Sequence, residues 1–230
     1  MNNITKKDIQ VFIEQLVCDD RNSYYFAAAK RNGVMSSQAY PKKDLYSAIV
    51  QMKDADHVYI SYNGYTDRSG RRTAENVRQI NGIFCDVDCH AASGQDLADK
   101  INRGVEEIKL AIEHKVIAAP TMIVHTGRGL HIYYLYANSV PAKKADGTPF
   151  VIGLRAHANL QKAIYQSLSV LLANTGLEVD AVCKDVTRLV RVAGTRNAHT
   201  GTEAFIIYNS HQRYSFAALR EYPVLELDDE

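Results

Sequence analysis

The chain has 230 residues, and its 46% hydrophobic content is enough for a substantial core, which excludes global disorder. Its net charge of +1 identifies no partner, because a domain that holds metal ions on carboxylates and phosphates on basic side chains can balance near zero. No apolar run reaches the roughly 20 residues of a membrane-spanning helix, and no secretory signal opens the chain, so we expect a cytoplasmic protein with no membrane partner.

The first half of the chain is predicted to alternate helices and strands. Thr5 and Asp8 resemble a capping box, and apolar residues at helical spacing then predict an N-terminal helix. The apolar stripe of this helix is Ile9, Phe12, Ile13, Leu16 and Val17. The elements expected after it are a strand at 24–29, a helix at 44–52, a strand at 57–62, a polar loop at 63–76 and a strand at 83–88.

The second half is predicted to begin with a long amphipathic helix capped by Ser93. The elements expected after it are strands at 122–126 and 130–136, a polar loop at 137–150, a helix through 164–172, a strand at 205–208, a short helix from Ser215 and an acidic tail. Because both hairpin turns and helices separate the strands, we expect an α/β fold with a mixed or antiparallel sheet and helices packed on it. We expect one domain over residues 1–230, cut from a longer protein at the acidic end.

The sharpest motif is the run Ile83-Phe84-Cys85-Asp86-Val87-Asp88. Alternate residues of a strand leave the same face, so Asp86 and Asp88 are expected side by side with Cα atoms about 7 Å apart. Two carboxylates on one face repel each other unless a cation lies between them, and Mg²⁺ and Mn²⁺ prefer oxygen ligands. The motif therefore indicates a metal site, with a solvated strand end as the plain alternative.

A second motif is Thr126-Gly127-Arg128-Gly129-Leu130-His131, followed by a strand. Its two glycines let the backbone turn sharply and approach a ligand closely. Arg128 at the tip and His131 at the strand start could then meet triphosphate oxygens. The alternative is a hairpin turn with a buried histidine in the core.

A third motif places Asp180 after an apolar residue and follows it with Arg188 and Arg191. A small-residue loop with polar tips comes next, at 194–201. Arginines near a carboxylate can form a plain salt-bridge cluster, which is the alternative when this motif is considered alone.

Together the order and spacing of the three motifs resemble the archaeo-eukaryotic primase superfamily. Its signature is hydrophobic-DxD, then small-x-His, then hydrophobic-Asp followed by an arginine-bearing segment and a small polar loop. The run Thr187 to Asn197 and the turn before His131 look most like plasmid and phage primases of the RepB type. The resemblance covers about residues 58–201.

The resemblance implies an RRM-like catalytic sheet with flanking helices and an N-terminal α/β extension. It implies two Mg²⁺ or Mn²⁺ ions on Asp86, Asp88 and Asp180, with Asp185 as a competing third carboxylate. It implies a nucleotide site formed by Arg128, His131, Arg188, Arg191, Asn197 and His199. One departure from the family pattern is His199, where a lysine or another cation is common.

The activity implied by the resemblance is template-directed transfer of a nucleotide from NTP or dNTP to a 3′-hydroxyl, in plasmid, phage or mobile-element replication. The implied partners are a single-stranded DNA template and the nucleotide, with a helicase or a helical accessory domain in the full-length protein. The rival reading is an RRM-like nucleic-acid binder without catalysis. A tyrosine nuclease is a weaker rival, because the chain lacks its second histidine at His131-Ile132-Tyr133.

Three further groups of residues are candidates on chemistry alone. Arginines upstream of the first motif could grip a nucleic-acid backbone, or belong to a solvated loop: Arg68, Arg71, Arg72 and Arg78. Three tyrosines are candidates for stacking on bases: Tyr62, Tyr133 and Tyr134. Zinc binding by Cys85, Cys89 and His90 is the weaker interpretation, because their spacing fits no common zinc module, and buried thiols explain the cysteines better.

Overall fold

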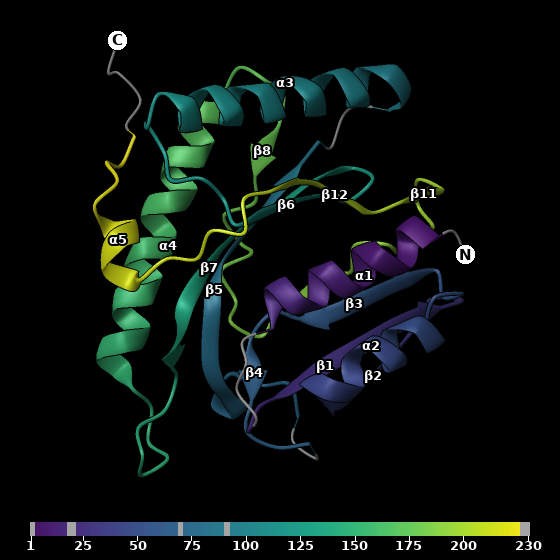
Figure 1. Cartoon of the computed structure of the whole chain (residues 1–230), viewed down its shortest axis with the longest axis vertical. Helices are drawn as coiled ribbons and strands as arrows, with labels where there is room; N and C mark the ends of the chain where they lie inside the picture. Colours follow the sequence, from purple (N-terminus) through teal and green to yellow (C-terminus); the bar gives the residue numbers. More distant parts are fainter. Residues whose placement is uncertain (1–2, 18–21, 69–70, 90–92, 226–230) are drawn as a thin grey trace.

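The main structural element of the fold is a ten-stranded sheet (Figure 1). The computed structural model describes residues 3–17, 22–68, 71–89 and 93–225. The strand order is β12, β6, β7, β5, β4, β1, β3 and β9, with β2 beside β1 and β8 beside β5. Neighbouring strands of this sheet pair antiparallel. The expected α/β fold with an antiparallel sheet and packed helices is therefore confirmed.

The strands of the large sheet have the following bounds: β1 Tyr24–Arg31, β2 Val34–Pro41, β3 His57–Ser61, β4 Gly64–Tyr65, β5 Val77–Asp88, β6 Met122–His125, β7 Gly129–Pro141, β8 Glu178–Val179, β9 Leu189–Arg191 and β12 Phe205–Asn209. A second, two-stranded sheet consists of β10 Arg196–Asn197 and β11 Thr202–Glu203. The helices are α1 Asn3–Leu16, α2 Lys42–Gln51, the 3₁₀ turn η1 Ala74–Asn76, α3 Gly94–Glu113, α4 Val151–Leu172 and α5 Phe216–Arg220.

Helices cover both faces of the sheet and create two hydrophobic cores. The helices α3, α4 and α5 lie on one side, and α1 and α2 lie on the other (Figure 1). Alternate residues of β7 enter different cores: Ile132 and Tyr134 pack toward α3 and α4, and Tyr133 and Leu135 pack toward α1. This period-two alternation is what a strand covered on both faces requires.

The two covered faces bury the three tyrosines that were candidates for stacking on bases. Tyr62 and Tyr133 have no exposed surface, and Tyr134 is 2% exposed. Their rings contribute apolar area to the cores, and none of the three is available to a base.

Several elements differ from the sequence prediction. Strand β5 begins at Val77 instead of residue 83, because Gln79 and Asn81 look like loop residues but are buried. Asn81 donates to the carbonyl oxygen of Tyr62 at 2.9 Å, and its backbone N–H donates to Oδ1 of Asn63 at 3.0 Å. Buried amides with such partners are tolerated inside a sheet.

Two expected loops are also shorter than predicted. The segment 63–76 contains β4 and η1, and β7 continues to Pro141 inside the expected loop 137–150. Strand β2 was not predicted, because most of its residues are exposed and show no apolar alternation.

The N-termini of three helices can be compared with the caps that the sequence predicted. Thr5 lies inside α1 and does not precede it. Ser93 occupies the N-cap of α3 without a side-chain hydrogen bond, whereas the Ser215 hydroxyl accepts from the N–H of Ala218 as a true cap. The end of the acidic tail, 226–230, lies outside the described residues. Within the described part of the chain, no helix combines the length and apolar composition that crossing a bilayer requires.

Candidate active site

The pairing of β5 with β7 brings the first two motifs together. Asp86 lies opposite His131, and Asp88 lies opposite Gly129. A Cβ atom on Gly129 would lie 1.9 Å from the carbonyl oxygen of Val87, so only glycine allows the two strands this close approach. The glycine of the second motif thus sets the register that faces the histidine toward the aspartate.

The third motif joins the same strand end through β8. Val179 pairs with Val87 and Glu178 pairs with Asp88, and the backbone N–H of Asp180 donates to the carbonyl oxygen of Asp86 at 2.8 Å. This backbone bond places the third carboxylate next to the first. Two aspartates from distant parts of the sequence therefore meet at the end of β5.

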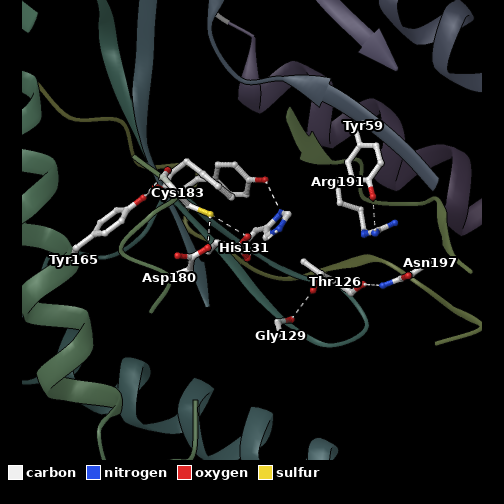
Figure 2. Close-up of polar contacts among 12 residues, drawn as sticks. Tyr59, Thr126, Gly129, His131, Tyr165, Asp180, Cys183, Arg191 and Asn197 are labelled. Atoms are coloured by element: carbon white, nitrogen blue, oxygen red, sulfur yellow. Dashed lines mark hydrogen bonds and ion pairs between the residues drawn. The ribbon is translucent and has the colours of Figure 1, made fainter. Parts of the chain in front are cut away.

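A compact group of ligand atoms results, formed by Asp86, Asp180 and Cys183. Figure 2 shows Asp180 and Cys183 next to each other. One ligand atom from each of these residues lies within 4.8 Å of the other two. The Cys183 sulfur is 2.8 Å from Oδ2 of Asp180 and 3.6 Å from Oδ2 of Asp86. Among the described residues, neither Asp88 nor Asp185 belongs to this group.

Asp185 has a different local role. Its carboxylate accepts from the N–H of Thr187 at 2.8 Å and from the Thr187 hydroxyl at 2.6 Å. Partial burial raises the pKa of Asp185, but these hydrogen bonds and the charges of Arg188 and Arg72 outweigh it and hold the pKa below its ordinary value. Asp185 thus closes a turn, whereas Asp180 lies beside Asp86.

The electrostatics of Asp86 favour a bound cation. Burial raises the pKa of its carboxyl, and the charge of Asp180 raises it further. A hydrogen bond from the Cys183 thiol and the charges of Arg188 and Arg191 act in the opposite direction. A half-buried pair of carboxylates is stabilised by a positive ion between them, so this donor set fits a divalent metal.

His131 is the neighbour that orients Asp86. Its Nε2 atom lies 3.4 Å from Oδ1 of Asp86, and its Nδ1 atom lies 3.2 Å from the hydroxyl of Tyr133. Burial lowers the pKa of His131 to about 3, and the charge of Arg191 acts in the same direction. The ring is therefore neutral near pH 7, and its Nε2 atom faces Asp86 while Nδ1 faces the Tyr133 hydroxyl.

The arginines of the third motif lie close to the acidic group. Arg191 is buried, and it donates to Nδ1 of His57 at 3.2 Å and to the Tyr59 hydroxyl at 3.3 Å, with its guanidinium 5.1 Å from the Tyr59 ring centre. Within the described chain, Nε of Arg188 is buried without a hydrogen-bond partner. The charges of both arginines lower the pKa of Asp86, so both lie within electrostatic reach of the carboxylates.

The small polar loop is tied to the glycine turn of the second motif. Asn197 donates to the carbonyl oxygen of Thr126 at 2.8 Å (Figure 2). Its Oδ1 accepts from the N–H of His199 at 3.2 Å. The ring of His199 lies 4.7 Å from that of His57. Arg128 is exposed at the turn. Of the predicted nucleotide residues, Asn197 therefore joins the polar loop to the glycine turn, and His199 and Arg191 both lie beside His57.

The upstream arginines separate into two sets. Arg68, Arg71 and Arg72 are exposed, and Arg72 donates to the carbonyl oxygen of Thr187 in the third motif. Arg78 instead lines a cavity of about 460 Å³ at the other end of β5. Lys143 and Lys144, which the sequence analysis did not single out, line the same cavity.

The sequence analysis did not identify two residues that lie at the acidic group. Cys183 was assigned no role; it is buried, and its sulfur faces two carboxylates. The Tyr165 hydroxyl on α4 lies 2.6 Å from the carbonyl oxygen of Phe84 and 3.0 Å from that of Cys183, so it fastens the third motif to β5. The spacing Asp180-x-x-Cys183 was a visible signal for the first residue, and the sequence holds none for the second.

The cysteines of the zinc interpretation are buried free thiols. Cys85 and Cys89 are 0% and 2% exposed, and the Cys89 sulfur lies 3.5 Å from the carbonyl oxygen of Gly176. His90 lies outside the described residues. Within the described residues, neither cysteine belongs to the group that could hold a metal.

Comparison with known proteins identifies the fold. No family model matches the sequence, and no curated protein matches it. The AEP domain of the primase-polymerase of cyanophage S-2L matches with a TM-score of 0.60 at 17% identity, over 94% of this chain and 97% of that one. The catalytic domain of primase RepB′, solved in complex with initiator DNA, matches with a TM-score of 0.53 at 15% identity, over 94% and 92% of the two chains.

A second RepB′ structure matches with a TM-score of 0.51 at 16% identity, and there the alignment covers 94% of this chain but 60% of that one. At these identities the likeness concerns the fold. This chain has the fold of primase and primase-polymerase catalytic domains, as the three motifs implied.

Proposed function

We propose that this chain, which has the fold of primase catalytic domains, is itself a primase or polymerase that transfers a nucleotide from NTP or dNTP to a 3′-hydroxyl on a single-stranded DNA template. The observation that carries the proposal is the meeting of Asp86 and Asp180 at the end of β5. A nucleic-acid binder without catalysis has no use for two adjacent, half-buried carboxylates in a metal-sized group.

Asp86, Asp88 and Asp180 are proposed as the residues that hold Mg²⁺ or Mn²⁺. Two such ions, when bound, lower the pKa of the attacking hydroxyl and offset the charge that develops on the transferred phosphoryl group. Asp88 lies two residues beyond Asp86 on the same face of β5, so it would hold the second ion. The neutral His131 holds the Asp86 carboxylate in place through Nε2.

The nucleotide is proposed to lie between the glycine turn and the third motif. Arg188 has a buried Nε atom without a partner in the described chain, and Arg128 is exposed at the turn, so both can reach phosphate oxygens. Arg191 donates a hydrogen bond to His57, and the ring of His199 lies next to the ring of His57. Asn197 shapes this region by joining the two loops.

The template backbone is proposed to contact the basic residues outside this region. Arg68, Arg71 and Arg72 are exposed, and Arg78 lies in the cavity with Lys143 and Lys144. Lysine and arginine contacts to phosphates supply affinity without sequence preference and weaken as salt rises. A helicase or helical accessory domain is an additional proposed partner in the full-length protein.

The test is primer synthesis on circular single-stranded DNA with labelled nucleotides, Mg²⁺ or Mn²⁺, and no added primer. The variants Asp86→Ala and Asp88→Ala are expected to stop incorporation, because loss of one essential metal ligand costs about 3 kcal/mol or more in the barrier, over a hundredfold in rate. The matched control is Glu178→Gln, which removes an exposed carboxylate on the strand β8 that pairs with β5; in the described chain Glu178 lies outside the metal group.

The outcomes separate three functions. Metal-dependent products from the unchanged chain and the control, but not from Asp86→Ala, support a primase. Extension of a supplied primer without initiation supports a polymerase that depends on a partner domain. DNA binding without incorporation in either assay would reject the proposal in favour of a binder without catalysis.

A further inference from the structure

The sulfur of Cys183 faces the two aspartates that the proposed function assigns to a metal. It lies 2.8 Å from Oδ2 of Asp180 and 3.6 Å from Oδ2 of Asp86. We propose that Cys183 is a thiolate ligand in a mixed carboxylate–thiolate metal position with these aspartates, and that this position prefers thiophilic ions such as Zn²⁺ and Co²⁺ to Mg²⁺. The inference rests on the proposed function, since it concerns the same aspartates.

The fold holds the sulfur in place through the backbone on both sides. The N–H of Cys183 donates to the carbonyl oxygen of Asp180 at 3.2 Å, which closes a tight turn between the two residues. The Tyr165 hydroxyl binds the carbonyl oxygens of Cys183 and Phe84, as Figure 2 shows beside the sulfur. A donor atom that is fixed before the metal arrives loses little conformational freedom on binding.

The remaining contacts leave one oxygen of each aspartate directed at the sulfur. Oδ1 of Asp180 accepts from the N–H of Val182 at 2.8 Å, and Oδ1 of Asp86 faces His131. Both Oδ2 atoms therefore converge on Cys183. Ligand atoms bound to one ion at roughly 2.0–2.3 Å in tetrahedral geometry lie about 3.6 Å apart, which matches the separation between the sulfur and Asp86. The 2.8 Å between the sulfur and Asp180 is a thiol hydrogen bond, and it has to lengthen when a metal replaces the thiol proton.

Thiolate is a soft ligand and selects different ions from carboxylate. Carboxylate and water oxygens suit Mg²⁺ and Mn²⁺, whereas thiolate favours Zn²⁺ and its neighbours. Metal binding replaces the proton of the Cys183 thiol, which now points at Asp180, by a metal–sulfur bond and releases that proton to solvent.

The plain alternative is a core thiol with an incidental hydrogen bond. Cys85 and Cys89 are such thiols, since both are buried and neither belongs to the metal group in the described residues. Cys183 is equally buried, but among the three described cysteines its sulfur is the one directed at carboxylates. Cys85 therefore provides an internal control.

The test is titration of the full chain with Co²⁺ alone, followed by absorption spectroscopy. A thiolate ligand is expected to produce an intense sulfur-to-cobalt charge-transfer band in the near ultraviolet. Cys183→Ser should remove this band and weaken Zn²⁺ binding by at least roughly tenfold, the lower end of the loss seen when even an outer-shell partner is removed. Cys85→Ala should keep the band, and Cys183→Asp should shift the preference toward Mg²⁺ and Mn²⁺.

The results separate this inference from the proposed function. Co²⁺ binding without the band, at equal affinity in the unchanged chain and Cys183→Ser, would overturn the thiolate assignment and leave the aspartate metal site standing. No binding of Co²⁺ or Mn²⁺ by the folded protein would overturn both. The band is measured on the unchanged chain, so the result does not depend on whether a variant folds.

Discussion

Nε2 of His131 lies 3.4 Å from Oδ1 of Asp86, because the two residues face each other across the antiparallel pair of β5 and β7. The histidine is buried and neutral, so it contributes no charge to this contact, and its Nε2 atom faces the carboxylate. A metal-holding carboxylate that is oriented in this way loses affinity when its partner is removed.

We therefore predict that His131→Phe lowers the affinity for Mn²⁺ by roughly 10–100-fold. The substitution keeps a ring at this position but removes the two nitrogens that face Asp86 and the Tyr133 hydroxyl. Isothermal titration with Mn²⁺ measures the effect, and His114→Phe at the exposed end of α3 is the control. Equal Mn²⁺ affinity in both variants would show that His131 does not position Asp86.

Tyr165→Phe is predicted to loosen the third motif. The change removes one hydroxyl that serves the carbonyl oxygens of Phe84 and Cys183, and both lie in the interior. Leaving buried carbonyl groups without a donor costs about 1–3 kcal/mol in the free energy of unfolding. Urea unfolding measures this cost, and nucleotide incorporation should fall with it because Asp180 follows the same backbone.

Ser169→Ala is the matched control for that variant. Ser169 is exposed on the same helix, and its hydroxyl bonds only the carbonyl oxygen of Tyr165 one turn earlier, so little change in stability is expected. If Tyr165→Phe unfolds at the same urea concentration as this control, the hydroxyl does not support the site.

His157 is predicted to make the fold acid-sensitive. It is 2% exposed on α4, and its Nδ1 atom lies 2.9 Å from the Tyr136 hydroxyl. Burial lowers the pKa of His157 to about 4, whereas a histidine in the unfolded chain titrates near pH 6.5. Between these values the unfolded state binds more protons, so stability falls as the pH falls, by about 3 kcal/mol in all.

Replacing His157 by glutamine removes this titration and keeps a polar partner for Tyr136. The free energy of unfolding, measured with urea between pH 7.5 and pH 4, should therefore fall less steeply in His157→Gln than in the unchanged chain. The two curves should run parallel above pH 6.5, where the histidine is neutral in both states. Parallel curves over the whole range would contradict the assignment.

The basic cavity at the far end of β5 is predicted to bind DNA backbone. Arg78, Lys143 and Lys144 line it together, and none of them belongs to the acidic group. The double variant Lys143→Ala/Lys144→Ala should weaken binding of single-stranded DNA. The slope of log affinity against log salt should fall by about 0.7 for each phosphate contact that is lost.

Fluorescence anisotropy of a labelled oligonucleotide at several salt concentrations measures this slope. Lys162→Ala, which removes an exposed charge on α4, is the control for a general loss of positive charge. An unchanged slope in the double variant would place the template elsewhere, with Arg68, Arg71 and Arg72 as the remaining candidates.

Local sequence patterns were sufficient for the elements whose periodicity is strong. The apolar stripes predicted α1, α3 and α4, and the alternation after Gly129 predicted β7. The patterns failed where buried residues are polar, as at Gln79 and Asn81 in β5, and where a strand is exposed, as in β2. In both cases the deciding partners lie in other elements, so no local pattern can reveal them.

The sequence by itself determined the chemistry of the site, because aspartates, arginines and a glycine turn carry their chemical character into any fold that brings them together. Only the tertiary structure decided which of them meet. The β5–β8 pairing places Asp180 beside Asp86 and leaves Asp185 in a turn, and it directs Cys183 at both carboxylates. These contacts depend on the register between strands that are distant in the chain, and backbone hydrogen bonds and the packing of α4 set that register.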